Sequence, residues 1–364
     1  MLKSLHIKSF RGLQDFVLDD LRPVTVLVGE NNSGKTSVLE AIMLAMAPGD
    51  SKKWFQILQA RDAAWNPQYS GEMARWLFPV VDRDHLDMRD PIEIACQVDE
   101  SFENLRLVFD QSFEVVPVTK RRMGEQATEE EKLTTTSLAI EWSSDHTGTK
   151  SGMITFKQVP SNVFVSRPAL VDPPLRRIPS RNRVLVKPHA HRFGRHGTES
   201  LSEAIKAGGK DEIITFLQLF DPDILEIDIV GERFSMDIYV QHRNLGPMPI
   251  HVFGDGMRKA VVVAGIAFQA AGGLLLLDEA EVALHVSCQD GFFRALFQLC
   301  ERLQVQVVLT THSLEAVDGV IRACSDVDTL SGFHLPDRNS GQAVKRMSGD
   351  IMERLRFERG LDLR

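Results

Sequence analysis

The chain contains few cysteines, and their spacing does not suggest a covalent or metal-held framework. Its four cysteines, Cys96, Cys288, Cys300 and Cys324, are spread over 364 residues, and no two of them form a C-x-x-C pair. Disulfide-dependent small folds and zinc knuckles both use closely spaced cysteines. The sequence therefore favours neither of these two classes.

Long hydrophobic runs are also missing. No apolar run approaches the roughly 20 residues that a membrane-spanning helix needs. Residues 1–8 have the pattern of a β-strand and lack the apolar segment of a signal peptide. We therefore expect a soluble, cytoplasmic protein that has no membrane partner.

Positive charge is not in excess. Lysine and arginine number 42 against 50 aspartates and glutamates, which gives a formal net charge of −8. This balance does not steer the whole protein toward nucleic acid, although a local basic patch could still do so. Hydrophobic residues make up 43%, as in a chain with an ordinary packed core, and the length suits two lobes or one domain with an insertion.

Residues 29–36 carry the most informative pattern, G-x-x-x-x-G-K-[ST], which is typical of a phosphate-binding loop. A buried-strand pattern at 24–28 precedes it and a helical pattern at 37–44 follows it, and this context disfavours the alternative of a plain glycine-rich turn. Backbone amides of such a loop wrap phosphates at a helix N-terminus. We expect nucleotide binding by Gly29, Glu30, Asn31, Asn32, Ser33, Gly34, Lys35, Thr36 and Ser37.

The chemistry of phosphoryl transfer suggests individual roles. Lys35 would reach the β- and γ-phosphates, and the Thr36 hydroxyl would bind Mg²⁺. Residues 274–277 are four leucines that end at Asp278 and Glu279. Asp278 would hold the metal and Glu279 would orient the attacking water. An acidic pair at a strand end can also cap a helix, but the leucines and the phosphate loop favour catalysis.

Two further segments lie at positions that often bind ligands, one at the carboxyl end of a predicted strand and one at the start of a predicted helix. His312 follows the apolar strand pattern at 307–310 and could bind the γ-phosphate, although a surface or capping histidine is the alternative. Gly254, Asp255 and Gly256 precede a predicted helix over 256–271, and they would make its N-terminus an acceptor of anions.

The predicted elements divide the chain into three parts. An N-terminal lobe over 1–166 holds the phosphate loop, a helical insert at 52–64 and 71–78, and an antiparallel meander. In the meander we expect a charged, solvated loop over 120–132, with a small helical projection as the alternative. A basic crossing rich in proline and arginine covers 167–197, and a C-terminal lobe over 198–364 alternates helices with buried strands, as in a parallel sheet.

Taken in order, these motifs resemble the ABC-type ATPase heads of the RecF and OLD-like group, and within it the short AAA-type ATPases of bacterial anti-phage and mobile-element operons. The resemblance rests on residues 9–12 (Ser-Phe-Arg-Gly), 29–36, 254–256, 274–279 and 310–313. It implies an α/β P-loop NTPase fold with a mixed N-terminal lobe, a parallel C-terminal sheet, a helical insert and no coiled coil. OLD nucleases continue into a Toprim nuclease domain, which we do not expect here.

The resemblance also implies roles for single residues. Arg11 would lie beside the nucleotide, and His312 would be the switch histidine. Segment 254–259 would act as a degenerate signature that contacts the γ-phosphate bound by a second subunit, and 281–285 would be the D-loop at the dimer interface. The signature lacks the serine-rich form of transporters, and no glutamine can be placed as the Q-loop residue, since Gln97 is not convincing.

Weaker signals leave alternatives open. His189, His191 and His196 could bind a metal, but the neighbouring arginines favour a solvated basic loop. Three tryptophans on predicted apolar helix faces would be core or interface anchors: Trp54, Trp65 and Trp76. Four arginines could contact nucleic-acid phosphates: Arg176, Arg177, Arg181 and Arg183.

The sequence thus predicts a Mg²⁺-dependent ATP hydrolase that dimerises on ATP. Its acidic balance favours control of a separately encoded effector, for example a nuclease, in anti-phage defence. The arginine-rich segment favours an alternative, a DNA-binding ATPase of repair or recombination. A nucleotide-gated scaffold that does not hydrolyse ATP is the third interpretation.

Overall fold

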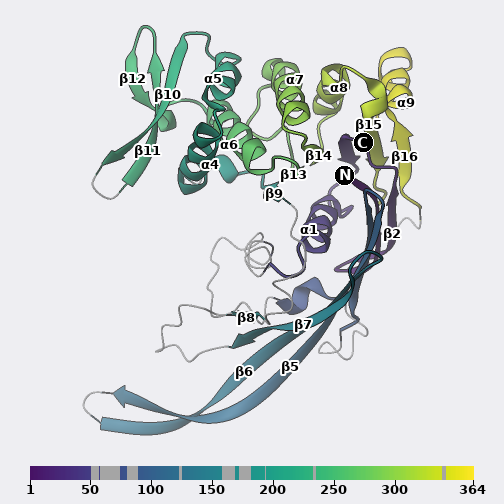
Figure 1. Ribbon diagram of the computed structural model, residues 1–364, viewed down its shortest axis with the longest axis vertical. Coiled ribbons are helices and arrows are strands. Elements are labelled where there is room, and N and C mark those ends of the chain that lie inside the picture. The colour runs from purple at the N-terminus through teal and green to yellow at the C-terminus, as the bar shows by residue number, and fades with distance from the viewer. Residues whose placement is uncertain are drawn as a thin grey trace. The chain divides into compact units, whose positions relative to one another are not determined.

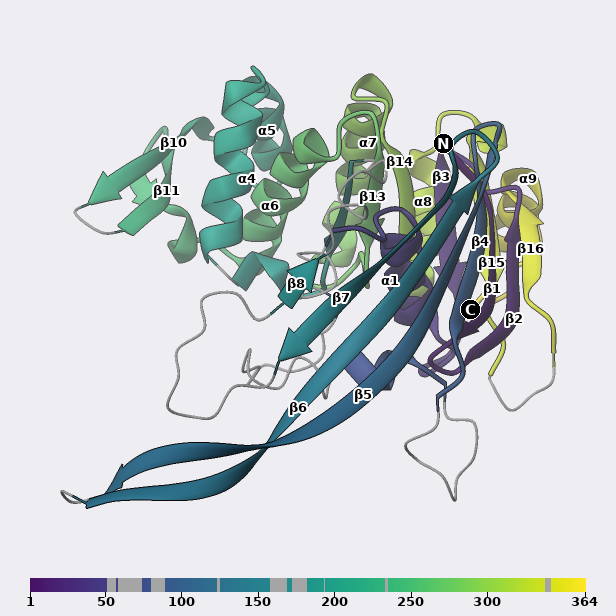
Figure 2. The ribbon, with the colours of Figure 1, turned by 60° about the horizontal axis from the view of Figure 1, so that its bottom comes forward.

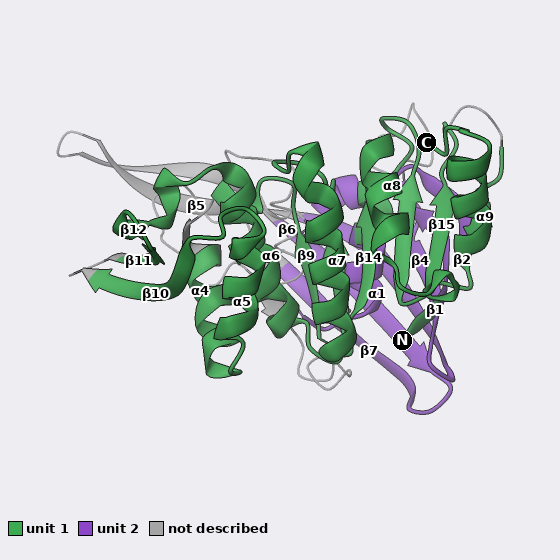
Figure 3. Cartoon of the chain, turned by 90° about the horizontal axis from the view of Figure 1, so that it is seen from above, with its two compact units in different colours: residues 1–3, 18–39, 181–364 green, residues 4–17, 40–180 purple. Residues whose placement is uncertain are grey.

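The computed structural model describes residues 1–50, 57, 74–79, 89–122, 125–157, 169–171, 182–192, 194–232, 235–337 and 342–364. The chain forms two compact units (Figure 3): the first comprises residues 1–3, 18–39 and 181–364, and the second residues 4–17 and 40–180. The phosphate loop therefore belongs to the same unit as the C-terminal half. This division differs from the predicted lobes over 1–166 and 198–364, because the strand before the loop pairs with C-terminal strands.

The first unit is built on a six-stranded sheet with the order β16-β15-β3-β14-β13-β9 (Figure 1). Its strands are β3 (Val24–Val28), β9 (Arg183–Val186), β13 (Leu274–Leu277), β14 (Gln306–Thr310), β15 (Leu330–His334) and β16 (Lys345–Ser348). All neighbouring strands of this sheet pair in parallel, except that β15 and β16 pair antiparallel. Every residue of β3, β13 and β14 is buried, as in parallel sheets covered on both faces.

Helices cover this sheet and form its core contacts. They are α1 (Lys35–Ala45, which continues into the second unit), α4 (Gly194–Lys206), α5 (Lys210–Gln218), α6 (Asp255–Gln269), α7 (Val286–Arg302), α8 (Leu314–Ala323) and α9 (Gly349–Glu353). The helix α8 begins where the Ser313 hydroxyl accepts a hydrogen bond from the amide of Ala316 at 3.1 Å. Edge-to-face packing of Phe216, Phe292 and Phe293 joins α5 to α7.

A small antiparallel sheet of β10 (Ile224–Glu232), β11 (Ser235–His242) and β12 (Gly246–Pro249) packs beside α4 and α5 (Figure 1). Short 3₁₀ helices connect elements of this unit at η4 (Ala190–Arg192), η5 (Ile250–Val252) and η6 (Val327–Thr329), and a π-helical turn, η7 (Arg354–Glu358), follows α9. Among the described residues, no helix is both long and apolar enough to cross a membrane.

The second unit contains a seven-stranded sheet with the order β2-β1-β4-β5-β6-β7-β8. The strands are β1 (Leu2–Phe10), β2 (Leu13–Asp19), β4 (Ile92–Val98), β5 (Ser101–Arg122), β6 (Glu125–Ser144), β7 (Gly148–Lys157) and β8 (Ala169–Val171). Alternate residues of β4 are buried, so this strand packs one face on a core. The predicted mixed α/β class is confirmed by these two sheets and their helices.

The predicted loop over 120–132 is wrong. There β5 and β6 pair without interruption to the tip of the hairpin, with Val118 opposite Glu129 and Arg122 opposite Glu125 (Figure 2). The neighbouring strands stop earlier, since β4 pairs with Ser101–Leu107 and β7 with Thr135–Ser144. The outer part of the hairpin is therefore a two-stranded ribbon, whose backbone pairs regardless of the charge on which the loop prediction relied.

Some predicted features lie partly or wholly outside the described residues. Of the helical insert, the structure describes Ile57 and a 3₁₀ helix, η2 (Arg75–Leu77). Trp54 and Trp65 fall outside the described residues. Trp76, predicted as a core or interface anchor, is 56% exposed, so the core alternative is wrong for it.

Gly273 is a close-packing point that aligns β13 with β9. The amide of Leu274 donates to Asn182 O at 2.9 Å, and a Cβ added at Gly273 would lie 1.9 Å from that same oxygen. This contact is between backbones, so it cannot be relieved by a side-chain rotation.

We expect Gly273→Ala to lower the free energy of unfolding by about 1–3 kcal/mol, because the backbones of β9 and β13 must separate. Urea denaturation measures this effect. Gly231→Ala is the matched control, because a Cβ there meets nothing within 4 Å, and its change should stay within about 0.5 kcal/mol. Equal stabilities for the two variants would contradict the packing argument.

Candidate functional site

The phosphate loop joins the end of β3 to the start of α1. Gly29, Asn32 and Gly34 have φ angles of 143°, 66° and 101°, which lie in the region that favours glycine. A Cβ on Gly29 would lie 2.3 Å from Leu335 O, so the first glycine is required by the neighbouring backbone. The Leu335 amide also donates to Val28 O at 2.8 Å, which fixes the point where the loop leaves the sheet.

Lys35 is folded back onto its own loop. Its Nζ donates to Gly29 O at 2.6 Å, to Glu30 O at 2.8 Å and to the Ser33 hydroxyl at 3.3 Å. Burial lowers the pKa of Lys35 to about 8, against the opposing effect of nearby carboxylates, of which Asp278 is the strongest. The loop thus holds a cation whose carbonyl partners phosphate oxygens could replace.

Thr36 and Asp278, which are far apart in the sequence, meet at one point. The Thr36 hydroxyl lies 3.1 and 3.0 Å from the two carboxylate oxygens of Asp278. Asp278 is only 9% exposed, and among the described residues no lysine or arginine forms an ion pair with it within 4 Å. A buried carboxylate beside a hydroxyl, with no direct ion pair to a lysine or arginine in the described part of the chain, fits the hard oxygen ligands that Mg²⁺ prefers.

Thr310, at the end of β14, joins Asp278 and Glu279, the residues predicted to bind the metal and to orient the water. Its hydroxyl donates to Asp278 Oδ1 at 2.8 Å and accepts from the amide of Glu279 at 2.8 Å. Sequence analysis included Thr310 in the motif 310–313 but gave it no role. Its position at the carboxyl end of the strand next to β13, where parallel sheets gather their functional groups, is a second sequence signal.

Glu279 and His312 lie at this same edge of the sheet. Glu279 has a φ of 46°, and its side chain is 39% exposed. His312 Nε2 is 3.9 Å from Glu279 Oε1, which is too far for a hydrogen bond, while the His312 amide donates to Glu281 Oε1 at 2.9 Å. The structure therefore brings together Lys35, Thr36, Asp278, Glu279 and His312.

The predicted signature lies at the start of α6. The helix N-cap is Gly254, which provides no side-chain hydrogen bond to the first turn, and a Cβ there would meet open space. The Asp255 carboxylate is paired with Arg192 at 3.3 Å and Arg258 at 3.0 Å. Burial raises its pKa, but contacts with His191 and Arg192 outweigh this effect and lower it.

His191 differs from the solvated histidine that was predicted. Its side chain is 1% exposed and its Nε2 lies 3.5 Å from Asp255 Oδ2, and burial lowers its pKa. The His189 ring is 6.3 Å away, and the side chain of His196 lies outside the described part of the chain. This histidine thus packs against the signature segment.

The predicted arginines have different surroundings. The guanidinium of Arg11 lies 3.1 Å from Oε2 of the fully buried Glu40, a partner on α1 that sequence analysis missed. Arg183 is 3% exposed in β9, so its predicted role in nucleic-acid binding is wrong. Arg176, Arg177 and Arg181 lie outside the described residues.

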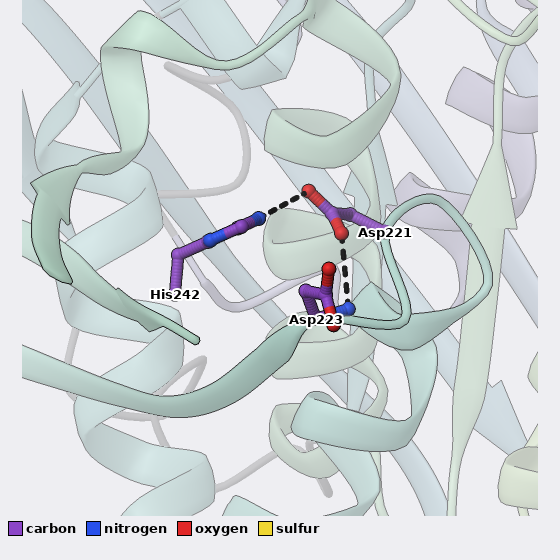
Figure 4. A group of neighbouring side chains, drawn as sticks. All are labelled: Asp221, Asp223 and His242. Carbon is purple, nitrogen blue, oxygen red and sulfur yellow. Dashed lines mark hydrogen bonds and ion pairs between the residues drawn. The ribbon is translucent and has the colours of Figure 1, made fainter. Parts of the chain in front are cut away.

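A separate group of acids and a histidine is explained by local hydrogen bonding (Figure 4). His242 Nδ1 accepts from the amides of Asn244 and Leu245, so Nε2 carries the proton and faces Asp221 at 3.3 Å. Asp221 Oδ1 also accepts from the amide of Asp223 at 3.0 Å. Both ring nitrogens are thus used in fixing the turn after β11, and a metal ligand role is not indicated.

Comparison with known proteins places the chain in a family. Residues 24–318 match the family described as "AAA domain, putative AbiEii toxin, Type IV TA system". The chain belongs to this family. Its relatives place it among the RecF and OLD-like ATPases and confirm the predicted ATP hydrolase.

Three relatives illustrate this group. An ATP/GTP phosphatase of Helicobacter pylori is 20% identical over 88% of this chain and 89% of its own length. An OLD nuclease of Thermus scotoductus is 26% identical over 86% of this chain. RecF, a DNA replication and repair protein of Desulfitobacterium hafniense, is 51% identical, but over 11% of each chain.

Coverage of the relatives varies. The match spans 59% of the OLD nuclease and 36% of an uncharacterised protein of Methanocaldococcus jannaschii. Among solved structures, an SMC head domain from Thermotoga maritima aligns with 95% of this chain and 98% of its own, at 14% identity and a TM-score of 0.41.

We expect Thr310→Val to reduce the rate of ATP hydrolysis about 10- to 100-fold, because Asp278 loses a donor and the Glu279 amide an acceptor. A coupled phosphate-release assay measures this rate. Thr25→Val is the control, since Thr25 is a buried, hydrogen-bonded threonine on β3, near Arg22 and Ser331. Equal rates for the two variants would contradict the role of Thr310.

Proposed function

We propose that this chain is a Mg²⁺-dependent ATPase that dimerises on ATP and controls a separately encoded effector in anti-phage defence. The observation that carries the proposal is the meeting of Thr36, Asp278 and Thr310 at the end of the phosphate loop. This arrangement brings together a loop that could bind phosphates, oxygen atoms that could bind a metal ion, and a carboxylate that could orient the attacking water.

Each residue has a distinct part in the proposed hydrolysis. Lys35 would exchange the carbonyls of Gly29 and Glu30 for phosphate oxygens of ATP. Thr36 and Asp278 would hold Mg²⁺, which supplies charge neutralisation when bound. Glu279 would accept a hydrogen bond from the attacking water and orient it, and His312 would contact the γ-phosphate.

Dimerisation would complete the site from a second copy of the chain. The proposal is supported by the N-terminus of α6, whose N-cap residue, Gly254, supplies no side-chain hydrogen bond to the first turn, and where a Cβ added at Gly254 would meet open space. Free amides at a helix start favour an anion, and the pairing of Asp255 with two arginines offsets its own negative charge. Gly254, Asp255 and Gly256 would thus contact the γ-phosphate held by the partner.

The role in defence rests on the family and on charge. The family description names a "putative AbiEii toxin, Type IV TA system", and one relative is an OLD nuclease. Both names are consistent with a role beside an effector. The net charge of −8 favours a protein partner over direct binding to nucleic acid.

We expect Glu279→Gln to bind Mg²⁺-ATP with unchanged affinity but to hydrolyse it at least about 100-fold more slowly, because phosphate contacts remain while water orientation is lost. The trapped ATP should drive the variant into dimers. Radioactive ATP turnover and sedimentation velocity, with and without ATP, measure the two effects.

Lys35→Ala is the control for that experiment. It should neither bind ATP nor dimerise, because it lacks the phosphate cation. A Glu279→Gln variant that hydrolyses ATP at the wild-type rate would exclude Glu279 as the water-orienting acid. One that stays monomeric at micromolar concentration with ATP would contradict the proposed dimer.

A DNA-binding ATPase is the second candidate, supported by the RecF match and the arginine-rich segment. If the chain controls a protein effector, binding to duplex DNA should be absent even at low salt. Direct action on DNA predicts affinity that falls steeply with salt. Replacement of Arg176, Arg177 and Arg181 should then make the slope of log affinity against log salt shallower by roughly 0.9 for each phosphate that the protein ceases to neutralise.

A further inference from the structure

Lys259 is a buried cation close to the proposed catalytic turn, and it is the last residue of the predicted signature segment 254–259, where it was given no role of its own. It lies in the second turn of α6 and is 4% exposed. Its Nζ donates to Val282 O at 2.6 Å and to Ala280 O at 2.7 Å, and approaches Glu279 O at 3.4 Å. All three donors of the ammonium group are therefore directed at one segment of backbone.

That segment is a turn with an unfavourable backbone. Glu279 and Ala283, at its two ends, have φ angles of 46° and 70°, which residues other than glycine rarely adopt. Within the turn, the amide of Val282 donates to Glu279 O at 3.0 Å and that of Leu284 to Glu281 O at 2.9 Å. A turn with two such residues persists where its surroundings hold it in place.

The helix α6 contacts the turn at a second point. A Cβ added at Gly256 would lie 3.0 Å from Ala283 O, so the first turn of the helix approaches the far end of the turn closely. Lys259 binds the near and middle carbonyls, one helical turn further along. The turn is thus braced along its length by one helix.

The charge of Lys259 acts on the main chain rather than on a carboxylate. Its bonds end on carbonyl oxygens, and the side chain of Glu279 remains 39% exposed. Burial lowers the pKa of Lys259 to about 8, although Glu281 and Glu279 oppose this shift. Burial, helped by the charge of Lys259, in turn lowers the pKa of His191. At neutral pH the ammonium group is charged, and its bonds to the carbonyls are strong.

We propose that Lys259 is a positioning residue for ATP hydrolysis, which holds the turn 279–283 against α6 so that the Glu279 carboxylate faces the attacking water. This inference rests on the proposed role of Glu279. It also implies that α6, whose start would face the nucleotide of a second copy, and the turn that carries Glu279 move as one piece.

A double-mutant cycle tests the inference. Lys259→Met keeps the length of the side chain and removes the three donors. We expect it to lower kcat about 10- to 100-fold while KM and the affinity for ATP change less than about two-fold. In the Glu279→Gln background the same change should alter the residual rate less than about two-fold, because the group that Lys259 positions is already gone.

Two further variants make the result decisive. Lys206→Met removes a lysine that is 68% exposed on α4, and it should leave all rates unchanged. Lys259→Arg keeps the charge and the N–H donors in a different geometry, so it should recover part of kcat. If the methionine variant does not fold, the arginine variant enters the same cycle with a smaller expected loss.

The outcomes separate this inference from the proposed function. Wild-type protein that hydrolyses ATP while Lys259→Met keeps its kcat would overturn the role of Lys259 alone. Equal losses with and without Glu279 would show a general structural role and would also overturn it. Wild-type protein that hydrolyses no ATP would overturn the proposed function, and this inference with it.

Discussion

The carboxylate of Asp278 is the group on which the candidate site depends. It accepts hydrogen bonds from the hydroxyls of Thr36 and Thr310, and so ties the end of β13 to the start of α1 and the end of β14. The same Thr310 hydroxyl orients the amide of Glu279. A buried carboxylate is costly unless it is bonded in this way, so the three strand and helix ends must stay together for the sheet to be stable.

Two buried lysines extend this arrangement outward. Lys35 and Lys259 both direct their ammonium groups at main-chain carbonyls, and burial lowers both pKa values to about 8. Lys35 bonds to its own loop, where a phosphate can take the place of the carbonyls. Lys259 bonds to the main-chain carbonyls of the turn at 279–283 and not to those of the phosphate loop, so its partners can stay the same when nucleotide binds. Perturbed lysines of this kind gather where a fold holds functional groups in fixed places.

The nucleotide site accounts for the chemistry of this protein, whereas its biological role depends on what binds outside that site. The family and the relatives agree that the chain is an ATPase, while their names span a toxin, a phosphatase, a nuclease and a DNA repair protein. A shared head with different outcomes is expected when hydrolysis is coupled to whatever binds outside the nucleotide site. The open helix start at Gly254 is one such contact point in the proposed dimer.

The phosphate loop, the acidic strand end and the α/β class can be predicted from the sequence, because each is encoded by neighbouring residues with a local pattern. Other features depend on pairing between distant residues and are seen only in the folded chain. Thr310 and Lys259 reach the catalytic turn across gaps of 31 and 20 residues, Glu40 pairs with Arg11, and Arg183 is buried in a strand. The charged segment at 120–132 became strand for the same reason. This segment pairs with the opposite strand of the hairpin. Backbone hydrogen bonds between two strands do not depend on the amino-acid composition of either strand, so composition could not predict them.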